Sequence, residues 1–440
     1  MMKVAIAGMG YVGLVTGVCL AEKGHEVTCV DLDRSKVEAV NEGRTPIFET
    51  GLDELLERNI GKRLHADSDL SSAVHGADLT MIAVGTPFNG TEIDLTAVKQ
   101  ATREIGEAIG TMDGFPIVVV KSTVVPGTTV QVVVPLLEEA SGKRAGEGFG
   151  VGANPEFLTE GRAVEDFMEP DRLVLGSLDE RTAAVLEELY ASFPEVPRVR
   201  TTLTTAEMIK YSSNALLATM ISFSNELGNL CTAVGDVDVV DVMNGLHSSM
   251  YLTIDGRKAP ITSFLEAGCG FGGSCLPKDV NALIAHGAAL GRPMSVLKAV
   301  IEVNEARADE VLRLVCEHVP SLAGANVTVL GLAFKPDTDD VRESPAVPII
   351  EQLLEGGASV RAHDPVVRRL PERLQDTGVE LEKGLADALA GADVVVIVTR
   401  WHHYEDVPAL LRESGSQPLV VDGRRMLGRD SVERYEGIGR

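Results

Sequence analysis

The sequence contains one cysteine that is placed to act as a nucleophile. Cys275 ends the glycine-rich segment Gly268-Cys-Gly-Phe-Gly-Gly-Ser-Cys, and Leu-Pro-Lys-Asp279 follows it. Because a proline suits the first helical turn, Cys275 is expected at a helix N-terminus, where the macrodipole and free N–H groups stabilise a thiolate. Asp279, one turn later, is placed to hold a water or a proton. We interpret Cys275 as a reachable nucleophile, the alternative being a buried structural cysteine, which is the role we assign to Cys269.

A glycine pattern near the start of the chain indicates a dinucleotide site. Gly8, Gly10 and Gly13 form a GxGxxG motif between an expected strand and an expected helix, where glycines let the backbone approach a pyrophosphate. Asp31 ends the next expected strand, where a carboxylate hydrogen-bonds a ribose diol and repels a 2′-phosphate. The pattern therefore predicts NAD rather than NADP, the alternative being a glycine turn without a ligand.

Two threonines follow later expected strands, at the sheet edge where open α/β proteins bind ligands. Thr86 lies in Gly85-Thr-Pro, which is either part of the site or an ordinary turn. Thr123 lies in Lys121-Ser-Thr, directly after an apolar run. Its hydroxyl is placed either to orient a water or substrate hydroxyl or to cap the next helix.

Two pairs of polar residues have helical spacing. Glu156 and Glu160 lie four positions apart, so a helical turn there would put them on one face, where crowding raises the pKa of one carboxyl toward the general-base range. The alternative is a pair of surface glutamates. Lys210 and Asn214 have the same spacing within an apolar helical stretch, which indicates a polar site rather than a solvated stripe.

A nucleophilic cysteine together with a dinucleotide site indicates a two-step oxidation. Oxidising an alcohol to an aldehyde needs only a cofactor and a base, but a second hydride leaves only after a nucleophile has added to the aldehyde carbonyl. The thiol adds, the thiohemiacetal gives up hydride, and water releases an acid from the thioester. The available groups for activating water and stabilising oxyanions are Glu160, Asp279, Lys210 and Asn214.

The elements that must position these residues form two similar α/β halves. Short apolar strands alternate with helical patterns from residue 3 to 153, and the same order returns at 327–333, 358–364 and 392–399. Residues 202–234 have helical periodicity without an internal proline, which predicts one long helix and a natural dimer surface. We therefore expect an α/β fold with two Rossmann-type, doubly wound parallel-sheet domains joined by a long central helix. The expected domains are residues 1–200, 201–318 and 319–440.

Composition limits the classes of function. The 440-residue chain carries 40 basic and 65 acidic residues, a net charge of −25, which disfavours general affinity for nucleic acid or anionic membranes. An anionic substrate must therefore meet a locally basic pocket. The 6 cysteines show no CxxC spacing, so we expect neither a disulfide framework nor a metal site, and we expect a cytoplasmic protein. No apolar run has the length of a membrane span, and the glycine-broken start is not typical of a signal peptide.

With these residues in place, the chain resembles the UDP-glucose/GDP-mannose dehydrogenase family over nearly its whole length. The resemblance rests on collinear motifs, namely GMGYVG from Gly8, VGTP from Val84, KSTVVPGT from Lys121, NPEFLTEG from Asn154, AEMIKYSSN from Ala206, FGGSCLPKD from Phe271, GLAFKPDTDDVRESP from Gly331 and VDGRRML from Val421. It implies an NAD-dependent nucleotide-sugar 6-dehydrogenase, with residues 1–200 binding NAD, 201–318 forming a catalytic and dimerisation domain, and 319–440 binding the nucleotide sugar.

The resemblance also implies roles for individual residues. Cys275 forms the thioester, Asp279, Lys210 and Thr123 organise water and oxyanion, and Glu160 serves thioester hydrolysis. The implied cofactor residues are Gly8, Gly10, Tyr11, Val12, Gly13, Asp31, Lys36, Thr86, Thr123, Glu160 and Arg342. The implied substrate residues are Glu156, Phe157, Leu158, Lys210, Asn214, Arg257, Phe264, Gly272, Lys335 and Arg424, of which Lys335 and Arg424 hold the diphosphate and ribose.

One departure leaves the nucleotide open. Arg257 lies farther before Cys275 than the matching arginine of members that act on UDP-glucose, which resembles the GDP-mannose branch. Asn229-Leu-Cys and Ala267-Gly-Cys-Gly instead resemble the UDP-glucose type. We expect a homodimer or higher homo-oligomer that oxidises an NDP-hexose, with UDP-glucose first and GDP-mannose or dTDP-glucose as alternatives. A single-step β-hydroxyacid-type dehydrogenase, and an NAD-sensing or scaffold protein, are the competing functions.

Overall fold

The structure is a computed structural model and describes all 440 residues. The chain forms two compact units, Met1–Ser213 and Asn214–Arg440. None of the helices is both long enough and apolar enough to traverse a bilayer.

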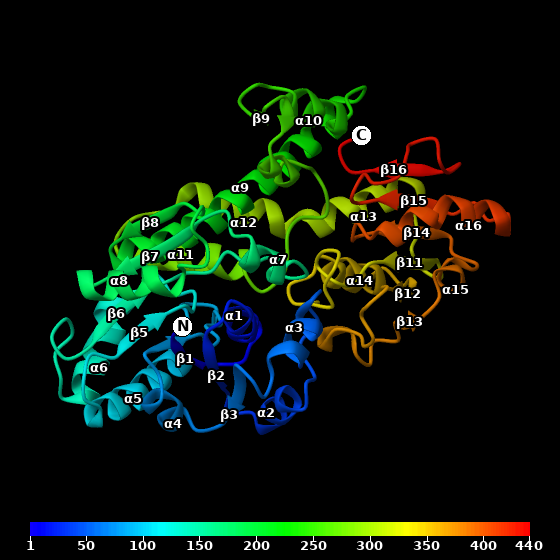
Figure 1. The fold of residues 1–440 in the computed structure, drawn as a ribbon. Helices are drawn as coiled ribbons and strands as arrows, with labels where there is room; N and C mark the ends of the chain where they lie inside the picture. Colours follow the sequence, from blue (N-terminus) through cyan, green and yellow to red (C-terminus); the bar gives the residue numbers. More distant parts are fainter. The chain divides into compact units, whose positions relative to one another are not determined.

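The first unit is built on an eight-stranded sheet, drawn from blue to green in Figure 1, with the order β3-β2-β1-β4-β5-β6-β7-β8. Its strands are β1 (Lys3–Ala7), β2 (Glu26–Val30), β3 (Leu64–Asp67), β4 (Leu79–Ile82), β5 (Ile117–Val120), β6 (Gly150–Ala153), β7 (Leu173–Ser177) and β8 (Arg198–Thr201). Strands β1 to β6 are parallel, whereas β7 pairs antiparallel with β6 and β8 runs parallel to β7. The strand order reverses between β1 and β4, which is where doubly wound sheets bind ligands.

Helices cover both faces of this sheet. They are α1 (Tyr11–Glu22), α2 (Arg34–Asn41), α3 (Leu52–Asn59), α4 (Leu70–His75), α5 (Thr96–Thr111), the π-helical turn η1 (Thr129–Val133), α6 (Val134–Ser141), α7 (Ala163–Met168) and α8 (Glu180–Leu189). In β5, Ile117 and Val119 belong to one apolar cluster, and Val118 and Val120 to another. Successive side chains of a strand point to opposite faces, so a run of four apolar residues marks a strand buried on both sides.

The helix α9 (Leu203–Val234) contains 32 residues, which confirms the predicted long central helix. The second unit continues with α10 (Val239–His247), the two-stranded hairpin β9 (Thr253–Ile254) and β10 (Arg257–Lys258), the 3-10 turn η2 (Pro260–Phe264), α11 (Leu276–Ala289), α12 (Ser295–Glu305) and α13 (Arg307–His318). The helical pattern from Met294 to His318 is thus interrupted at Ala306.

The second unit also contains a six-stranded parallel sheet, drawn from yellow to red in Figure 1, with the order β13-β12-β11-β14-β15-β16. Its strands are β11 (Asn326–Leu330), β12 (Ser359–His363), β13 (Glu380–Glu382), β14 (Val394–Ile397), β15 (Leu419–Asp422) and β16 (Tyr435–Gly437). Its helical elements are α14 (Ala346–Glu355), η3 (Glu372–Leu374), α15 (Leu385–Leu389), η4 (His402–Asp406) and α16 (Val407–Ser414). The order of its six strands repeats that of β3 to β6 in the first sheet, which confirms the expectation of two Rossmann-type sheets.

Candidate active site

The glycine turn between β1 and α1 has the geometry of a dinucleotide cradle. Gly8 has φ +103°, and a Cβ there would lie 2.7 Å from the Ala83 carbonyl oxygen. A Cβ on Gly13 would lie 1.9 Å from the carbonyl oxygen of Gly8, so both positions exclude side chains. A Cβ on Gly10, in contrast, would meet no atom within 4 Å. The turn is therefore packed at its two ends and open at its centre, where a phosphate would approach the backbone.

A carboxylate lies beside this turn. Asp31 follows β2, and its Oδ2 accepts a hydrogen bond from the Met9 N–H at 2.8 Å, while Oδ1 accepts one from the Asp33 N–H at 3.0 Å. The ammonium of Lys36 lies 3.8 Å from Asp31 Oδ2. The open glycine turn and the adjacent carboxylate together fit the diphosphate and the adenosine ribose of NAD.

The threonines Thr86 and Thr123 meet at the carboxyl edge of this sheet. They follow the paired strands β4 and β5, and the buried Thr86 hydroxyl donates to the Thr123 carbonyl oxygen at 2.8 Å. The helical stretch after Thr123 begins at Thr129 with Thr128 in the N-cap position, so Thr123 does not cap it. The capping alternative is therefore wrong, and the half-buried Thr123 side chain stays a candidate for substrate or water.

Glu156 and Glu160 do not share a helix face. Residues 154–159 are irregular and α7 begins only at Ala163, so the helical turn on which the predicted carboxylate pair depended is absent. The N–H groups of Leu158 and Thr159 instead donate to the side chains of Glu156 and Asp166, and such bonds compete with a helical turn. Glu156 instead forms a buried ion pair with Lys210, with 3.2 Å between Glu156 Oε1 and Lys210 Nζ.

An aromatic ring borders this ion pair. The ammonium of Lys210 lies 5.4 Å from the centroid of the Phe157 ring, and the guanidinium of Arg172 lies 4.0 Å from the same centroid. The Leu158 N–H donates to Glu156 Oε2 at 2.5 Å. The predicted substrate residues Glu156, Phe157 and Leu158 therefore lie together with Lys210 in the first unit.

Two side chains hold the turn after Glu160. Glu49 was not predicted as a site residue, and Tyr11 was implied only as a cofactor residue. The buried carboxylate of Glu49 accepts hydrogen bonds from the Gly161 N–H at 2.7 Å and the Ala163 N–H at 2.8 Å. The Tyr11 hydroxyl accepts from the same Gly161 N–H at 2.9 Å. Because Tyr11 begins α1, these bonds tie the Glu160 turn to the dinucleotide cradle.

In the second unit, Cys275 occupies the N-cap of α11, and Pro277 lies in its first turn. The side chain of Cys275 is exposed, and its backbone carbonyl accepts the Asp279 N–H at 2.9 Å. Ser274 Oγ lies 3.5 Å from Cys275 Sγ. Cys269 is buried, and its Sγ donates to the Gly423 carbonyl oxygen at 3.3 Å. Helix N-termini favour thiolates, and here the sulfur at such an N-terminus is also exposed.

The carboxylate of Asp279 is buried beside this N-terminus. Its Oδ2 accepts from Asn214 Nδ2 at 2.6 Å, and its Oδ1 accepts from Lys278 Nζ at 2.5 Å. Asp279 is 2% exposed and Asn214 is 6% exposed. Two separately predicted site residues, Asn214 on α9 and Asp279 on α11, are thus in direct contact.

The loop before Cys275 is fixed by hydrogen bonds from buried side chains. Asn304 both accepts from the Phe271 N–H at 2.8 Å and donates to the Phe271 carbonyl at 3.0 Å. Arg307 donates to the Gly268 carbonyl at 3.0 Å. A Cβ on Gly272 would lie 2.1 Å from the Glu343 carbonyl oxygen, so this predicted substrate residue must be glycine to let the two chain segments pass.

The predicted substrate cations of the last domain follow strands of the second sheet. Arg424 follows β15, and it donates to the carbonyl oxygens of Val398 at 2.6 Å and Gly270 at 3.1 Å. Burial lowers the pKa of Arg424 from its usual value. Lys335 follows β11 and lies half-buried, 5.9 Å from the centroid of the Phe334 ring. The exposed Arg342 pairs with Asp340 at 2.7 Å.

The second sheet differs from the first at the position that matches Asp31. Asp364 follows β12, is 2% exposed, and accepts backbone hydrogen bonds from Leu332 and Ala333. It also accepts from the N–H groups of Val366, Val367 and the Trp401 indole. A carboxylate with five internal donors has no capacity left for a ribose diol. This sheet therefore lacks the dinucleotide signature of the first.

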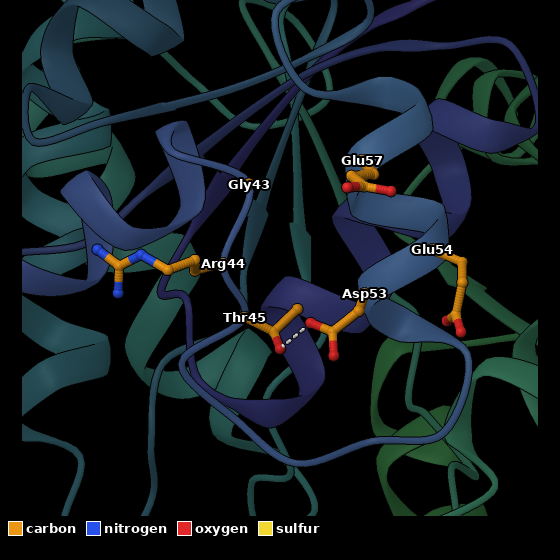
Figure 2. A pocket seen from close by; sticks show the side chains of 6 residues that line it. All are labelled: Gly43, Arg44, Thr45, Asp53, Glu54 and Glu57. Carbon is orange, nitrogen blue, oxygen red and sulfur yellow. Dashed lines mark hydrogen bonds between the residues drawn. The ribbon is translucent and has the colours of Figure 1, made fainter.

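A surface hollow of about 460 Å³ lies elsewhere in the first unit, between the loop after α2 and helix α3. Figure 2 shows the Thr45 hydroxyl pointing to the Asp53 carboxylate, with Glu54 and Glu57 farther along α3. Gly43 and Arg44 complete the lining. None of the predicted site residues lines it.

Models of one protein family match successive parts of the chain. The NAD binding domain of the UDP-glucose/GDP-mannose dehydrogenase family matches residues 2–194, its central domain matches 204–306, and its UDP binding domain matches 328–429. The chain belongs to this family. The match to an NAD binding domain agrees with the glycine cradle and Asp31, and the cofactor is NAD.

Individual members of the UDP-glucose/GDP-mannose dehydrogenase family are similar over the full length. UDP-glucose 6-dehydrogenase AglM of Haloferax volcanii is 42% identical over 446 residues, covering 99% of this chain and 100% of that protein. GDP-mannose 6-dehydrogenase of Pseudomonas putida is 36% identical over 450 residues, with 99% and 100% covered. The structure of a UDP-glucose dehydrogenase from Pyrobaculum islandicum has a TM-score of 0.89 and 39% identity, covering 100% of this chain and 98% of that one.

Two predicted substrate residues of this family member lie apart from the groups described above. Arg257 is exposed on the hairpin strand β10, and Phe264 ends η2 half-buried. The segment before this hairpin exposes two large apolar side chains, because Met250 is 85% exposed and Tyr251 is 95% exposed. Nothing within one chain explains this exposure.

Proposed function

We propose that this protein is a UDP-glucose 6-dehydrogenase that oxidises the sugar C6 alcohol in two steps to the carboxylate through a thioester on Cys275. The observation that supports this most is the exposed Cys275 sulfur at the N-terminus of α11, at the end of a loop held by buried side chains. A single-step β-hydroxyacid-type dehydrogenase has no use for such a thiol.

The residues of the chain divide the work as follows. In the first oxidation, Lys210 holds negative charge that develops on the substrate oxygen, and Glu156 orients Lys210. In the second, Cys275 Sγ forms a bond to the aldehyde carbon, and the carbonyl oxygen takes the negative charge. Asp279, fixed by Asn214, accepts the alcohol proton in the first oxidation and, after releasing it to solvent, the thiol proton in the second. The carbon bonded to sulfur then loses hydride, and its C=O bond re-forms in the thioester. Thr123 and Glu160 orient and deprotonate the water that breaks the C–S bond and releases the carboxylate and the thiol.

NAD supplies the hydride acceptor for each of the two oxidations. Gly8, Gly10 and Gly13 would hold its diphosphate, and Asp31 with Lys36 its adenosine ribose. Tyr11, Val12, Thr86 and Arg342 complete the proposed cofactor residues.

UDP-glucose is proposed as substrate because relatives at 42% and 40% identity are named UDP-glucose 6-dehydrogenases. GDP-mannose is the second candidate, since relatives named GDP-mannose 6-dehydrogenases reach 39% identity. Lys335 and Arg424 would bind the diphosphate and ribose, and Phe264, Gly272 and Arg257 would line the site.

A second copy of this chain is the proposed partner, packed along α9. Leu216, Phe223 and Leu230 recur at seven-residue spacing and are 52%, 47% and 58% exposed. A heptad stripe of apolar side chains on a long helix is typical of a helix–helix interface. We propose residues 1–200, 201–318 and 319–440 as the domains. We propose a reducing cytoplasm as the location, because the 6 cysteines show no CxxC spacing.

The proposed function predicts two NADH per sugar oxidised. Purified protein is incubated with excess NAD and limiting UDP-glucose, GDP-mannose or dTDP-glucose, and NADH is measured by absorbance and the uronate by chromatography. We expect two equivalents and the highest initial rate with UDP-glucose. One equivalent, with release of an aldehyde or ketone, would contradict the two-step reaction.

Cys275→Ser should abolish uronate release and leave NAD binding within about twofold, because serine is a much weaker nucleophile toward the aldehyde. The matched control is Cys316→Ser, which changes the other exposed cysteine and should retain full activity. Normal turnover by Cys275→Ser would refute the covalent step.

A further inference from the structure

A buried lysine that the proposed mechanism does not use lies within electrostatic range of the Glu156–Lys210 pair. Lys121 follows β5 and is only 3% exposed. Both of its hydrogen bonds go to Asn154, with Nζ 3.0 Å from Oδ1 and 3.3 Å from the backbone oxygen. Lysine is rarely buried unless its charge has a partner, so this placement requires an explanation.

The position of Asn154 connects Lys121 to the site. Strands β5 and β6 pair with Val120 opposite Ala153, so Lys121 and Asn154 are the first residues after two neighbouring strands. Glu156 follows Asn154 by two residues and reaches Lys210 at 3.2 Å. The ammonium of Lys121 therefore holds the start of the short turn that carries Glu156.

Charge connects the three groups as well. Burial lowers the pKa of Lys121 to about 8, with Glu156 opposing this change and the charge of Lys210 adding to it. Electrostatic coupling between two sites is reciprocal, so the charge of Lys121 must equally disfavour the protonated form of Lys210. With all three ionised, the cluster carries one positive charge in excess, which suits a site that must stabilise an oxyanion.

The other groups around this cluster in the first unit are uncharged or separately paired. The Tyr190 hydroxyl, at the end of α8, donates to Asn154 Oδ1 at 2.5 Å, and burial raises its pKa, so it stays neutral. Arg172 lies on the Phe157 ring and pairs with Asp171 at 2.6 Å. Glu207 on α9 accepts from the Gly127 and Thr129 N–H groups.

We propose that Lys121 is a positioning residue for the oxidation, because its buried ammonium fixes the Asn154–Glu156 turn and adds a second positive charge beside Lys210. This inference rests on the proposed role of Lys210. By fixing the segment from Asn154 to Glu156, Lys121 orients Glu156 and hence Lys210. By adding a positive charge, Lys121 makes Lys210 easier to deprotonate and so sets the upper pH limit of the first hydride transfer.

The test is the pH dependence of the first hydride transfer, measured by stopped-flow NADH formation with saturating UDP-glucose. Lys121→Met removes the positive charge at similar length, whereas Lys121→Arg keeps it at every pH, so the alkaline limb of the rate should lie about one pH unit higher in Lys121→Met than in Lys121→Arg. Wild-type Lys121 loses its charge near pH 8, so the wild-type limb should lie between those of the two variants. The matched control, Tyr190→Phe, removes the other hydrogen bond to Asn154 without changing charge, and should leave the limb in place.

If the variants are slower at every pH but the alkaline limb does not move, Lys121 has only a structural role and the inference is wrong. If Lys121→Met does not fold, as judged by thermal unfolding, the sign of the shift in Lys121→Arg decides. The first hydride transfer does not need Cys275, so this test is separate from the NADH yield. A single NADH per sugar would overturn the proposed two-step function, and unmoved limbs would overturn only the role of Lys121.

Discussion

At the scale of residues, the site depends on carboxylates that accept backbone N–H groups. Asp31 accepts from Met9 in the glycine turn, and Glu49 accepts from Gly161 and Ala163 after Glu160. Each such bond joins segments that are far apart in sequence. The functional groups are therefore positioned by residues that themselves take no part in chemistry.

Glu49→Ala should lower the free energy of unfolding by about 1–3 kcal/mol, because the Ala163 N–H loses its acceptor while the Gly161 N–H keeps the Tyr11 hydroxyl. We expect a loss of activity as well, since Glu160 directly precedes the same turn. Urea unfolding and the rate of uronate release measure the two effects. Glu57→Ala, an exposed glutamate in the nearby helix α3, is the control and should change neither by much. Equal stability of the two variants would refute this account of Glu49.

At the scale of elements, the loop that leads into α11 is as specific as the cysteine at its end. Gly270 has φ +91°, and a Cβ there would lie 2.5 Å from Asn304 Oδ1. The interruption between α12 and α13 leaves Asn304 and Arg307 on either side of Ala306, and both donate to carbonyls of this loop. The loop geometry is thus set by side chains from two helices.

Gly270→Ala should slow alkylation of Cys275 by iodoacetamide at least about tenfold and destabilise the protein by about 1–2 kcal/mol, because a left-handed residue gains a Cβ that meets Asn304. Thiol labelling followed by mass spectrometry measures the first effect, and thermal unfolding the second. Gly245→Ala in α10 is the control, since a Cβ there meets no atom within 4 Å. Wild-type labelling of Cys275 in Gly270→Ala would show that the loop geometry does not set thiol access.

At the scale of the whole molecule, the two Rossmann-type sheets share the order of six strands but differ in the accessibility of one matching carboxylate. Asp31 keeps accessible surface, whereas Asp364 is enclosed by five donors. The net charge of −25 also means that an anionic nucleotide sugar must be held by local cations. We assign that task to Lys335 and Arg424.

The proposed oligomer makes a prediction at this scale. Phe223→Glu places a charge at the centre of the apolar stripe on α9, so it should weaken self-association at least about tenfold, because the interface would bury an unpaired charge. Sedimentation velocity across a concentration series measures the change. Val296→Glu, at an exposed apolar position of α12, is the control and should sediment as wild type does. An unchanged sedimentation profile for Phe223→Glu would place the partner surface elsewhere.

Local patterns in the sequence were sufficient for the elements and for much of the site. The glycine turn, the strand ending at Asp31, the N-cap position of Cys275 and the long helix α9 all depend on residues close together in the chain, and the structure has them where they were predicted. The repeated strand order was also readable, because a four-residue apolar strand buried on both faces leaves a clear signal.

Contacts between distant residues were decided only by the tertiary structure. The sequence suggested a Glu156–Glu160 pair, but residues 154–159 are irregular and Glu156 pairs with Lys210 across 54 positions of chain. The role of Glu49 depends on a hydrogen bond spanning 112 positions, for which no local pattern exists. Lys121 stood within a recognised motif, yet only its burial beside Asn154 distinguishes it from a surface lysine. Periodicity reports which face of an element is buried, whereas the partner of a buried charge depends on how the elements pack.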